Sequence, residues 1–214
     1  ETFDLLSNEV RLDILRTLGE AMAEEDAPLS FTGLQRRVGV EDNGRFNYHL
    51  TKLTGRLVAK RDDGYELKPP GNNIYQAIVS GAYTDEAGTD PVPGDDEHCP
   101  YCGADAAAWY EDSHFHLGCS ECENLVIRYP IPPASFNPDQ PESLLAAGGA
   151  YILRDQASMR QGICPYCAGE VESELTKEGG GLEEFNERVY TSVARFVCVR
   201  CSWSMHCGVP FALN

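Results

Sequence analysis

The apolar residues near the start of the chain recur at intervals of three or four, the spacing that places side chains on one face of an α-helix. This pattern predicts an amphipathic helix over residues 1–20, with Ser7 as the N-cap of its main part. The residues that share the apolar face are Phe3, Leu6, Val10, Ile14 and Leu18. The chain therefore begins with a helix that needs a core to pack against.

Two shorter helices are predicted to follow. Ser30 is the predicted N-cap of a helix that runs until Gly39, a residue type that commonly ends helices. Asp42-Asn43-Gly44 then predicts a turn, and a third helix covers about residues 45–53. This third helix buries one apolar stripe and leaves its polar side chains on the other faces.

A β-hairpin and a fourth helix complete the first part of the chain. Two short runs within residues 57–67 predict strands, and Asp62-Asp63-Gly64 between them is a typical hairpin turn. Pro69-Pro70-Gly71 is expected to break the chain before a helix at residues 72–83. Three helices and a hairpin in this order predict a winged helix-turn-helix, which we assign to residues 1–84.

The second part of the chain begins after an acidic linker at residues 85–97. We expect this linker to be too polar to bury and too rich in proline to form a helix. Two cysteine-rich segments follow, at residues 98–134 and 162–214. The segment between them, residues 135–161, is expected to contain a helix that connects the two over about residues 142–160.

The connecting helix is unusual because it is apolar on nearly every side and contains Gly148-Gly149. Each glycine weakens a helix by about 1 kcal/mol relative to alanine, so close packing against another backbone is the expected compensation. Two arrangements would provide it. The helix is either buried between its own two cysteine-rich segments or forms the seam of a dimer.

Eight of the nine cysteines form Cys-x-x-Cys pairs, and all of them lie after residue 98. Two sulfurs at this spacing can bind one metal ion from a single turn, and two such turns complete a tetrahedral four-sulfur site. Cys-Pro-Tyr-Cys occurs twice, so the two sets form an internal repeat. The predicted ligands are Cys99, Cys102, Cys119 and Cys122 in the first set and Cys164, Cys167, Cys198 and Cys201 in the second.

These patterns predict two structural Zn²⁺ ions in two small zinc ribbons. Four thiolates can also hold iron or an iron–sulfur cluster, and a redox switch made of paired thiols is a further alternative. Four sulfurs fill the tetrahedron and leave no position for water, so hydrolytic chemistry is not expected. A ribbon of this size is too small for a core of its own, so we expect the metal to supply the folding energy.

The ninth cysteine, Cys207, is expected to be a buried thiol. Because His206 lies beside it, a spare metal ligand or a reactive thiol is the alternative. His98, His114 and His116 border the first set of cysteines, but four sulfurs already complete a site, so we expect surface or hairpin roles for them. The sequence shows no nucleophile paired with a base, no phosphate loop and no open metal site, so we do not expect an enzyme.

The chain is strongly acidic, with a formal net charge of −17 and 34 acidic residues against 17 basic ones. Taken alone, this charge disfavours nucleic acid as a partner, because an acidic surface repels phosphate. A lysine-poor acidic surface is also an adaptation to molar salt, where the screening length is only about 3 Å. Under halophilic conditions the local charge therefore matters more than the total.

One segment reverses the charge of the chain. Residues 31–61 contain seven basic and two acidic residues, a net of +5. We predict that the third helix reads base edges of double-stranded DNA, while the second helix and the hairpin hold phosphates. In chemistry, Arg45 suits guanine and Asn47 suits adenine. The predicted DNA-contacting residues are Arg36, Arg37, Arg45, Asn47, Tyr48, His49, Lys52, Lys60 and Arg61.

The first part of the chain resembles a known family. Leu5-Leu6-Ser7-Asn8-Glu9-Val10-Arg11-Leu12-Asp13-Ile14-Leu15 is similar to the first-helix signature of ArsR-like regulators. His49-Leu50 with Leu53, then Leu57-Val58 and a Gly64-Tyr65-Glu66-Leu67 wing, are similar to the rest of that module. With its lysine-poor acidity, the chain resembles a haloarchaeal ArsR-like winged helix-turn-helix transcriptional regulator with a C-terminal zinc-ribbon extension.

This resemblance implies a sequence-specific DNA-binding regulator that acts as a homodimer. The chain departs from the family in two places. Gly55-Arg56 stands where a glycine directly before the Leu-Val of the wing is usual, and the winged-helix part lacks metal-sensing cysteines. Archaeal transcription factor E, which binds the transcription machinery, also combines a winged helix with a zinc ribbon and is the main alternative. A regulator that loses zinc on thiol oxidation is another.

No apolar run is long enough to span a membrane, and no basic-then-apolar start suggests a signal peptide. We therefore expect a cytoplasmic protein, in which cysteines serve as metal ligands rather than as disulfides. Taken together, the patterns predict an α+β protein. Its N-terminal winged helix-turn-helix is followed by two small four-cysteine zinc ribbons joined by a helix.

Overall fold

The computed structural model describes residues 2–83, 88–176 and 193–208. The chain divides into two compact units, unit 1 (Glu1–Tyr83) and unit 2 (Thr84–Asn214). Helices dominate unit 1 and strands dominate unit 2, so the protein is of mixed α+β class, as the sequence predicts. The boundary that the sequence predicts between residues 84 and 85 lies outside the described residues.

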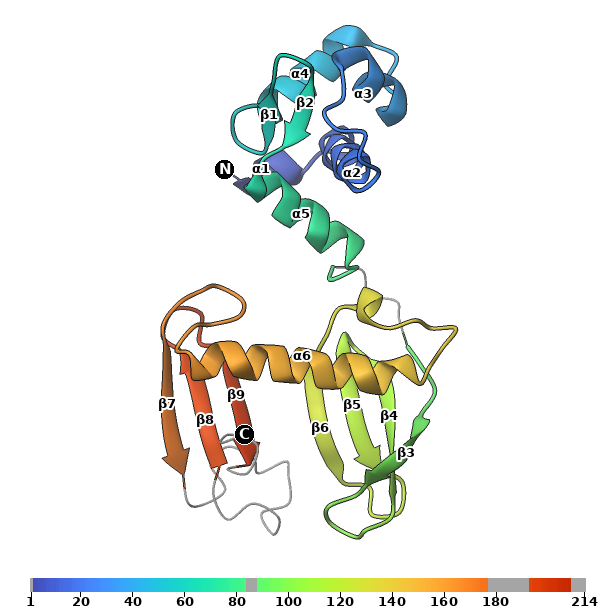
Figure 1. Ribbon diagram of the computed structural model, residues 1–214, viewed down its shortest axis with the longest axis vertical. Helices are drawn as coiled ribbons and strands as arrows, with labels where there is room; N and C mark the ends of the chain where they lie inside the picture. The colour runs from blue at the N-terminus through green and yellow to red at the C-terminus, as the bar shows by residue number, and fades with distance from the viewer. Residues whose placement is uncertain (1, 84–87, 177–192, 209–214) are drawn as a thin grey trace. The chain divides into compact units, whose positions relative to one another are not determined.

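Unit 1 contains five helices and one β-hairpin among its described residues (Figure 1). The hairpin is antiparallel and places Val58 opposite Leu67 and Lys60 opposite Tyr65. The elements in chain order are α1 (Thr2–Leu6), α2 (Glu9–Ala23), α3 (Phe31–Val38), α4 (Asn43–Leu53), β1 (Val58–Lys60), β2 (Tyr65–Leu67) and α5 (Pro69–Val79).

The limits of α3 and α4 follow from local hydrogen bonds. The backbone N–H of Gly33 donates to the hydroxyl of Ser30 at 3.1 Å, and Gly39 ends α3 in a left-handed conformation with φ of 77°. Both predicted limits of this helix are therefore confirmed. The N–H of Arg45 donates to the carboxylate of Asp42 at 2.6 Å, so α4 begins two residues earlier than the sequence predicts.

Two boundaries in unit 1 differ from the sequence prediction. The first helix is not continuous over residues 1–20, because Asn8 is extended, with φ of −135°, and occupies the N-cap position of α2 in place of Ser7. The Pro69-Pro70 pair does not break the chain. It forms the first turn of α5, where a proline sacrifices no helical hydrogen bond.

One hydrophobic core holds unit 1 together. Apolar side chains of α2, α3, α4 and the hairpin meet in it, and Ile14, Leu34 and Phe46 are fully buried there. Helix α5 packs on α2 where Gly19 leaves room for the ring of Tyr75, since a Cβ on Gly19 would lie 2.3 Å from that ring. The core thus fixes which side of α4 faces solvent.

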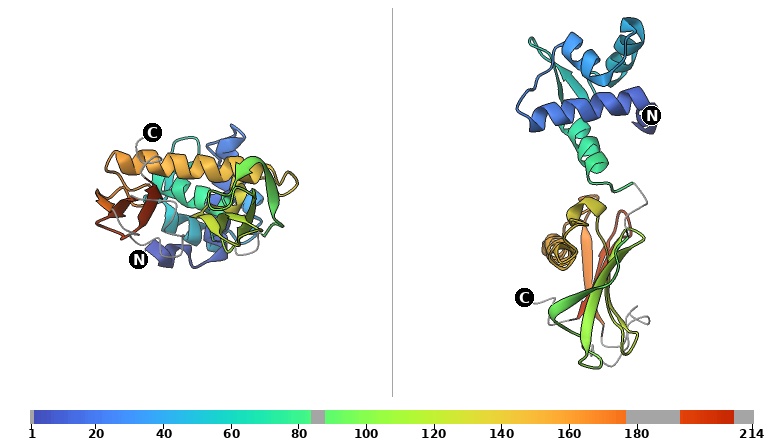
Figure 2. Two further views of the ribbon diagram at one scale, coloured as in Figure 1. Left: turned by 90° about the horizontal axis from the view of Figure 1, so that it is seen from below. Right: turned by 90° about the vertical axis from the view of Figure 1, so that its right-hand side faces the viewer.

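Unit 2 contains two antiparallel sheets and one long helix among its described residues (Figure 1). The first sheet has the strand order β3-β4-β5-β6 and the second has the order β7-β8-β9. Helix α6 lies across both sheets on one side, as its end-on view in the right panel of Figure 2 shows. The elements are β3 (Val92–His98), β4 (Asp105–Glu111), β5 (His114–Cys119), β6 (Leu125–Pro130), a 3-10 turn (Pro133–Ser135), α6 (Ser143–Arg160), β7 (Val171–Thr176), β8 (Val193–Cys198) and β9 (Ser204–Gly208).

The two sheets repeat one arrangement of strands and cysteine pairs, as the repeated Cys-Pro-Tyr-Cys sequence predicts. In each sheet a cysteine pair precedes one strand, the next strand ends at the first cysteine of the second pair, and a third strand follows that pair. Strand β5 ends at Cys119 and strand β8 ends at Cys198. A strand in each sheet thus runs directly into a candidate metal ligand.

Strand β3 corrects the predicted organisation of unit 2. The sequence predicts a linker over residues 85–97, but Val92–His98 pairs with β4, with Val92 opposite Ala108 and His98 opposite Asp105. An edge strand needs backbone hydrogen bonds on one side only, so an acidic segment that contains proline can form one. Among the described residues, the first sheet therefore has one strand more than the second.

A hydrophobic core joins α6 to both sheets, as expected if the helix packs between its own two cysteine-rich segments, and neither sheet has a separate core among the described residues. Phe115 and Tyr129 come from the first sheet, Phe196 comes from the second, and Leu144 and Met159 come from α6. All five side chains are buried. The two cysteine-rich segments thus fold around one helix and share its apolar side.

The two glycines of α6 have different surroundings. A Cβ on Gly148 would lie 2.6 Å from the ring of Phe115, so this glycine lets α6 lie directly on the first sheet. The neighbour is an aromatic ring and not the second backbone that the sequence analysis expects. A Cβ on Gly149 would meet nothing within 4 Å.

Candidate metal centres and candidate nucleic-acid interface

The first cysteine cluster lies at one end of the four-stranded sheet. Its four Sγ atoms, from Cys99, Cys102, Cys119 and Cys122, all lie within 4.8 Å of one another. Cys99 and Cys122 are 3.5 Å apart, and Cys102 and Cys119 are 3.6 Å apart. Sulfurs bound to one tetrahedral Zn²⁺ at about 2.3 Å are about 3.8 Å apart, so these spacings fit a single metal ion.

The second cluster has the same geometry. The Sγ atoms of Cys164, Cys167, Cys198 and Cys201 also lie within 4.8 Å of one another. Cys164 and Cys201 are 3.8 Å apart, and Cys167 and Cys198 are 3.5 Å apart. The structure therefore brings the eight predicted ligands together in two sets of four, and each set comes from two pairs that are neighbours in sequence.

The four Cys-x-x-Cys turns share one backbone geometry. The residue after the second cysteine is left-handed in all four, with φ of 76° at Gly103, 57° at Glu123, 53° at Ala168 and 60° at Ser202. In each turn the N–H of the first cysteine donates to the carbonyl five residues later, as from Cys99 to Ala104. This conformation turns both sulfurs of a pair toward one point, which is what shared coordination requires.

Nearby N–H groups favour the thiolate form of one cysteine in each cluster. The side-chain amide of Asn124 donates to the sulfur of Cys122 at 3.1 Å and, with its backbone N–H, lowers the pKa of Cys122 to about 6. The backbone N–H groups of Cys201 and Arg200 lower the pKa of Cys198 to about 6. Negative charge is thus already favoured at both clusters near neutral pH.

One other sulfur in each cluster, that of Cys102 or of Cys167, resists further negative charge. The N–H of Ala104 lowers the pKa of Cys102, but the neighbouring cysteines outweigh it and raise that pKa to about 12. The pKa of Cys167 is also raised to about 12. The N–H of Gly169 lowers this pKa, but desolvation and the neighbouring sulfurs raise it by more. Four thiolates at these distances require a cation among them, so the donor set of each cluster fits one metal ion.

Cys207 lies outside both clusters, on β9. Its thiol is 3.9 Å from the carbonyl of Ala194 and 3.9 Å from the amide of Gln156 on α6. Burial raises the pKa of Cys207, which makes the thiol less reactive. Cys207 is half-buried, rather than buried as the sequence predicts, and it packs against the core of unit 2; among the described residues it belongs to no group of possible metal ligands.

The three histidines near the first cluster do not join it. His98 lies 3.2 Å from the carboxylate of Asp105, and a ring nitrogen of His114 lies 2.6 Å from a backbone carbonyl. His116 stacks on Trp109 with ring centres 5.0 Å apart. These contacts agree with the expectation that sulfurs alone form the site.

A buried polar group that sequence reasoning missed lies where α6 meets both sheets. Asp155 is completely buried, and its carboxylate accepts hydrogen bonds from Tyr129 at 2.8 Å and from Arg154 at 2.6 Å. Burial and the Asp155 carboxylate raise the pKa of Tyr166, in the second cysteine-rich segment, to about 12. Asp155 therefore ties the first sheet to the surroundings of the second cluster. Asp155 is the only acidic residue of α6, and this is the signal that could have identified it.

The candidate nucleic-acid interface is the outer side of α4. Arg45, Asn47, Tyr48 and Lys52 are exposed, and Tyr48 keeps 59% of its surface accessible. The ammonium of Lys52 lies 5.4 Å from the centre of the Tyr48 ring. His49 is only half-exposed, and burial, with Arg11 and Arg45 nearby, lowers its pKa. Four of the predicted base-reading residues are thus exposed on α4, with Arg45 and Asn47 on opposite flanks of its outer side, and His49 lies deeper.

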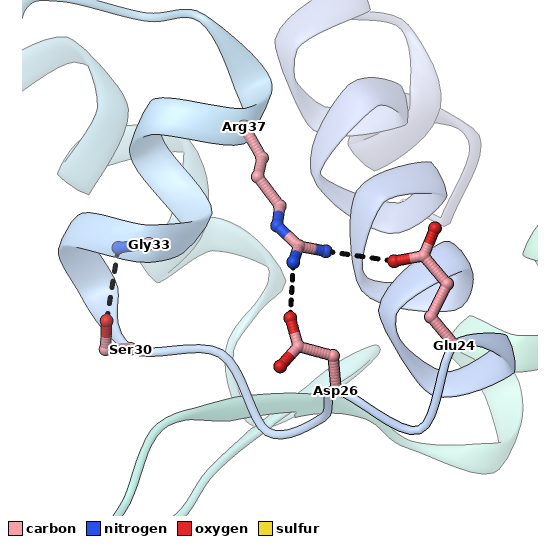
Figure 3. Close-up of polar contacts among 5 residues, drawn as sticks. All are labelled: Glu24, Asp26, Ser30, Gly33 and Arg37. Carbon is pink, nitrogen blue, oxygen red and sulfur yellow. Dashed lines mark hydrogen bonds and ion pairs between the residues drawn. The ribbon is translucent and has the colours of Figure 1, made fainter.

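The other predicted contacts divide into paired and unpaired cations. Arg36 is exposed and Lys60 lies 6.0 Å from the centre of the Tyr65 ring. Arg37 instead forms ion pairs with Asp26 and, at 3.4 Å, with Glu24 (Figure 3).

Arg61 is likewise engaged, because its guanidinium lies 2.6 Å from the carboxylate of Glu66. Two of the nine predicted DNA contacts therefore already have carboxylate partners inside unit 1. The helical pattern alone does not show the pairs of Arg37, since its partners Glu24 and Asp26 lie in the connection between α2 and α3.

The structure defines an α+β protein with two four-cysteine clusters, each able to hold one metal ion. Residues 96–214 match a family described as a domain of unknown function, DUF7351, and residues 1–78 match a second one, DUF7347. Because the first match covers more than half of the chain, the chain belongs to the DUF7351 family. Comparison with curated proteins and with solved structures gives no match.

Among residues 2–83, 88–176 and 193–208, no helix is both long enough and apolar enough to cross a bilayer.

Proposed function

We propose that the chain is a sequence-specific DNA-binding transcriptional regulator that acts as a homodimer and carries two structural Zn²⁺ ions. In this proposal unit 1 is a winged helix-turn-helix. Helices α3 and α4 form the helix-turn-helix, α4 is the recognition helix, and the β1–β2 hairpin is the wing. The likeness of unit 1 to ArsR-like regulators supports the same assignment.

The observation that carries the proposal is the exposed polar side of α4 within a positively charged segment. Phe46, Leu50 and Leu53 are buried and hold α4 on the core, so its other side faces outward. Residues 31–61 have a net charge of +5 in a chain of −17. A recognition helix needs this combination, because polar side chains read base edges while basic ones hold the phosphates beside them.

Specific roles follow from the chemistry of each side chain. The guanidinium of Arg45 can donate two hydrogen bonds to guanine, and the amide of Asn47 can pair with adenine. Tyr48 and Lys52 are exposed farther along α4, and His49 lies deeper on the same helix. Arg36 and Lys60 are exposed and suit phosphates, whereas the ion pairs of Arg37 and Arg61 give these two a secondary role.

Zn²⁺ is the ion that we propose for both clusters. The sulfur spacings of 3.5 to 3.8 Å suit tetrahedral coordination, and four sulfurs leave no open position for water or substrate. The proposal therefore gives the metal a structural role and assigns no catalytic step to the chain.

The test begins with a genome-wide footprint of the protein at the salt concentration of its own cytoplasm, with metal content measured on the same sample. We expect discrete protected sites and two zinc ions per chain. The strongest site then serves as the probe for an Arg45→Ala/Asn47→Ala variant. Each lost base contact costs about 1–3 kcal/mol, so specific affinity should fall by a factor of roughly 30 or more.

The matched control is Arg16→Ala, which removes an exposed arginine of α2 that faces Asp13 at 3.9 Å. This variant should bind the probe as the parent does. If the double variant keeps the affinity and sequence preference of the parent, α4 is not the recognition helix. If the footprint shows no discrete sites, sequence-specific regulation is excluded.

A further inference from the structure

The outer side of α6 presents an apolar surface that no described residue of the chain covers. Leu153 keeps 66% of its surface accessible, and three alanines on the same side are exposed. Their spacing of three, four or seven positions places them along one helical face. This surface, called the outer face of α6, consists of Ala146, Gly149, Ala150, Leu153 and Ala157.

Gly149 is the residue of this face that its own fold does not explain. Gly148 is needed because a Cβ would lie 2.6 Å from the Phe115 ring, but a Cβ on Gly149 would meet nothing within 4 Å. Glycine weakens a helix relative to alanine, so its presence at an open position calls for a reason outside the chain. Close approach of a second backbone is such a reason, since a missing Cβ allows helices to pack at short distance.

Exposed charges of opposite sign lie at the two ends of the outer face. Glu142 lies just before the first turn of α6 and Arg160 lies in its last turn, and both are exposed. Between them the only acidic residue is Asp155, which is fully buried. The exposed guanidinium of Arg154, at the edge of the outer face, lies 2.6 Å from the carboxylate of Asp155. In an acidic unit, the outer face therefore has no exposed negative charge along its middle, and it is negative at one end and positive at the other.

We propose that the outer face of α6 is the surface through which two copies of this chain associate, with the two helices antiparallel and crossing near Gly149 and Ala150. The inference rests on the homodimer of the proposed function and names its interface. A twofold axis at this point places the outer face of one copy against the same face of the partner subunit, which is the arrangement of most symmetric dimers. Leu153 of one copy then lies over Ala146 of the partner subunit.

Charge complementarity selects the antiparallel orientation and a second copy as the occupant. In this orientation Glu142 of each copy lies beside Arg160 of the partner subunit, so opposite charges meet at both ends. A parallel pair would place like charges together at both ends, which is unfavourable. The small residues in the middle admit the two exposed leucines without any change of backbone.

The first experiment is sedimentation equilibrium of the full chain with its metal bound, at several protein concentrations. The parent should form dimers, and Leu153→Glu should raise the dimer dissociation constant at least about tenfold, because the buried carboxylate would lack a partner. Leu175→Glu is the matched control, since Leu175 lies on β7 in the same unit and keeps 72% of its surface accessible. Its dissociation constant should equal that of the parent, and circular dichroism checks that both variants fold.

A charge exchange tests the orientation. Glu142→Arg and Arg160→Glu should each weaken the dimer about three- to tenfold at 0.1 M salt, because a twofold dimer contains the pair twice. The double variant should restore the parent constant. At about 1 M salt, where screening is nearly complete, the single variants should approach the parent while Leu153→Glu stays weak.

Three results overturn the proposal. A Leu153→Glu chain that dimerises as tightly as the parent removes α6 from the interface but leaves the proposed homodimer intact. A double charge variant that is weaker than both single variants excludes the antiparallel orientation. A parent chain that is monomeric at every concentration excludes this interface and the homodimer together, while footprinting judges DNA binding separately.

Discussion

Arg36 and Arg37 are neighbours on α3, but they have different contacts. Arg37 is paired with Glu24 and Asp26, so its charge is already balanced within unit 1. Arg36 is exposed and has no carboxylate partner among the described residues. Of these two arginines, Arg36 is therefore the one whose charge would be available to a phosphate in the proposed DNA complex.

We predict different effects of removing these two arginines on the salt dependence of DNA binding. Arg36→Gln should reduce the slope of log affinity against log salt by about 0.9, because each phosphate contact releases about 0.9 of a bound counterion from DNA. Arg37→Gln should leave the slope unchanged and lower the free energy of unfolding by at most about 1 kcal/mol, as is usual for exposed ion pairs. Fluorescence anisotropy over a salt series measures both slopes. Equal losses of slope in the two variants would show that Arg37 leaves its carboxylates to meet DNA.

Among the elements, α6 contains two adjacent glycines whose surroundings differ. Gly148 faces the Phe115 ring of the first sheet, and Gly149 faces open space. Replacing each glycine by alanine therefore separates the effect of packing on stability from the effect of helix propensity. The two positions are adjacent in the helix, so the change in propensity should be nearly the same.

Gly148→Ala should destabilise unit 2, because its Cβ would lie 2.6 Å from the Phe115 ring and force the helix away from the sheet. Overpacking of this kind costs about 1–3 kcal/mol. In a dilute sample, Gly149→Ala should instead gain about 1 kcal/mol from helix propensity. Chemical denaturation followed by tryptophan fluorescence measures both changes. A stabilised Gly148→Ala variant would contradict the packing of α6 on the first sheet.

Much of this architecture could be predicted from local sequence. The cysteine pairs were assigned to two sets of four because a Cys-x-x-Cys turn brings its own two sulfurs together. The limits of α3 were predictable because Ser30 and Gly39 act through hydrogen bonds and backbone conformation within a few residues. Such features need no knowledge of distant contacts.

Features that depend on distant partners could not be predicted in this way. Strand β3 has an acidic sequence without alternation, and it exists because the edge of β4 offers backbone hydrogen bonds. Asp155 is stable in the core because Tyr129, far away in sequence, donates to it. Of the candidate DNA contacts, Arg37 has the right charge, but its partner Asp26, 11 residues away in sequence, is seen only in the structure.

For the whole molecule, the shared core of unit 2 couples the two candidate metal sites. Phe115 and Tyr129 of one sheet and Phe196 of the other pack with the same helix. The Tyr166 ring of the second cluster lies 4.8 Å from Trp203, which lies 6.2 Å from Tyr129. Unfolding around one cluster should therefore destabilise the other sheet, because these contacts would be lost.

We predict that a strong chelator at neutral pH releases both ions and unfolds unit 2, while unit 1 stays folded. Structural zinc contributes about 10–16 kcal/mol per site, which matches or exceeds the whole stability of a typical domain. Both tryptophans, Trp109 and Trp203, lie in unit 2, so their fluorescence reports on that unit alone. Acid should act in the same direction, because protons compete with the metal for thiolates as the pH falls.

Retained helical circular dichroism would show that unit 1 survives, since five of the helices belong to it. A Cys198→Ser/Cys201→Ser variant, which keeps the first cluster intact, separates the sites. In chemical denaturation, this variant should also lower the midpoint of unfolding that Trp109 reports for the first sheet. Unchanged fluorescence after release of two ions would contradict a structural role for the metal.

The order of elements in unit 2 also bears on how the protein is made. All four strands of the first sheet and all four of its cysteines precede α6, and the second set of cysteines follows it. A polypeptide leaves the ribosome with its amino end first, at about 5–20 residues per second. The first site is therefore offered to the metal supply of the cell several seconds before the second is complete, and the helix that joins them is synthesised in that interval.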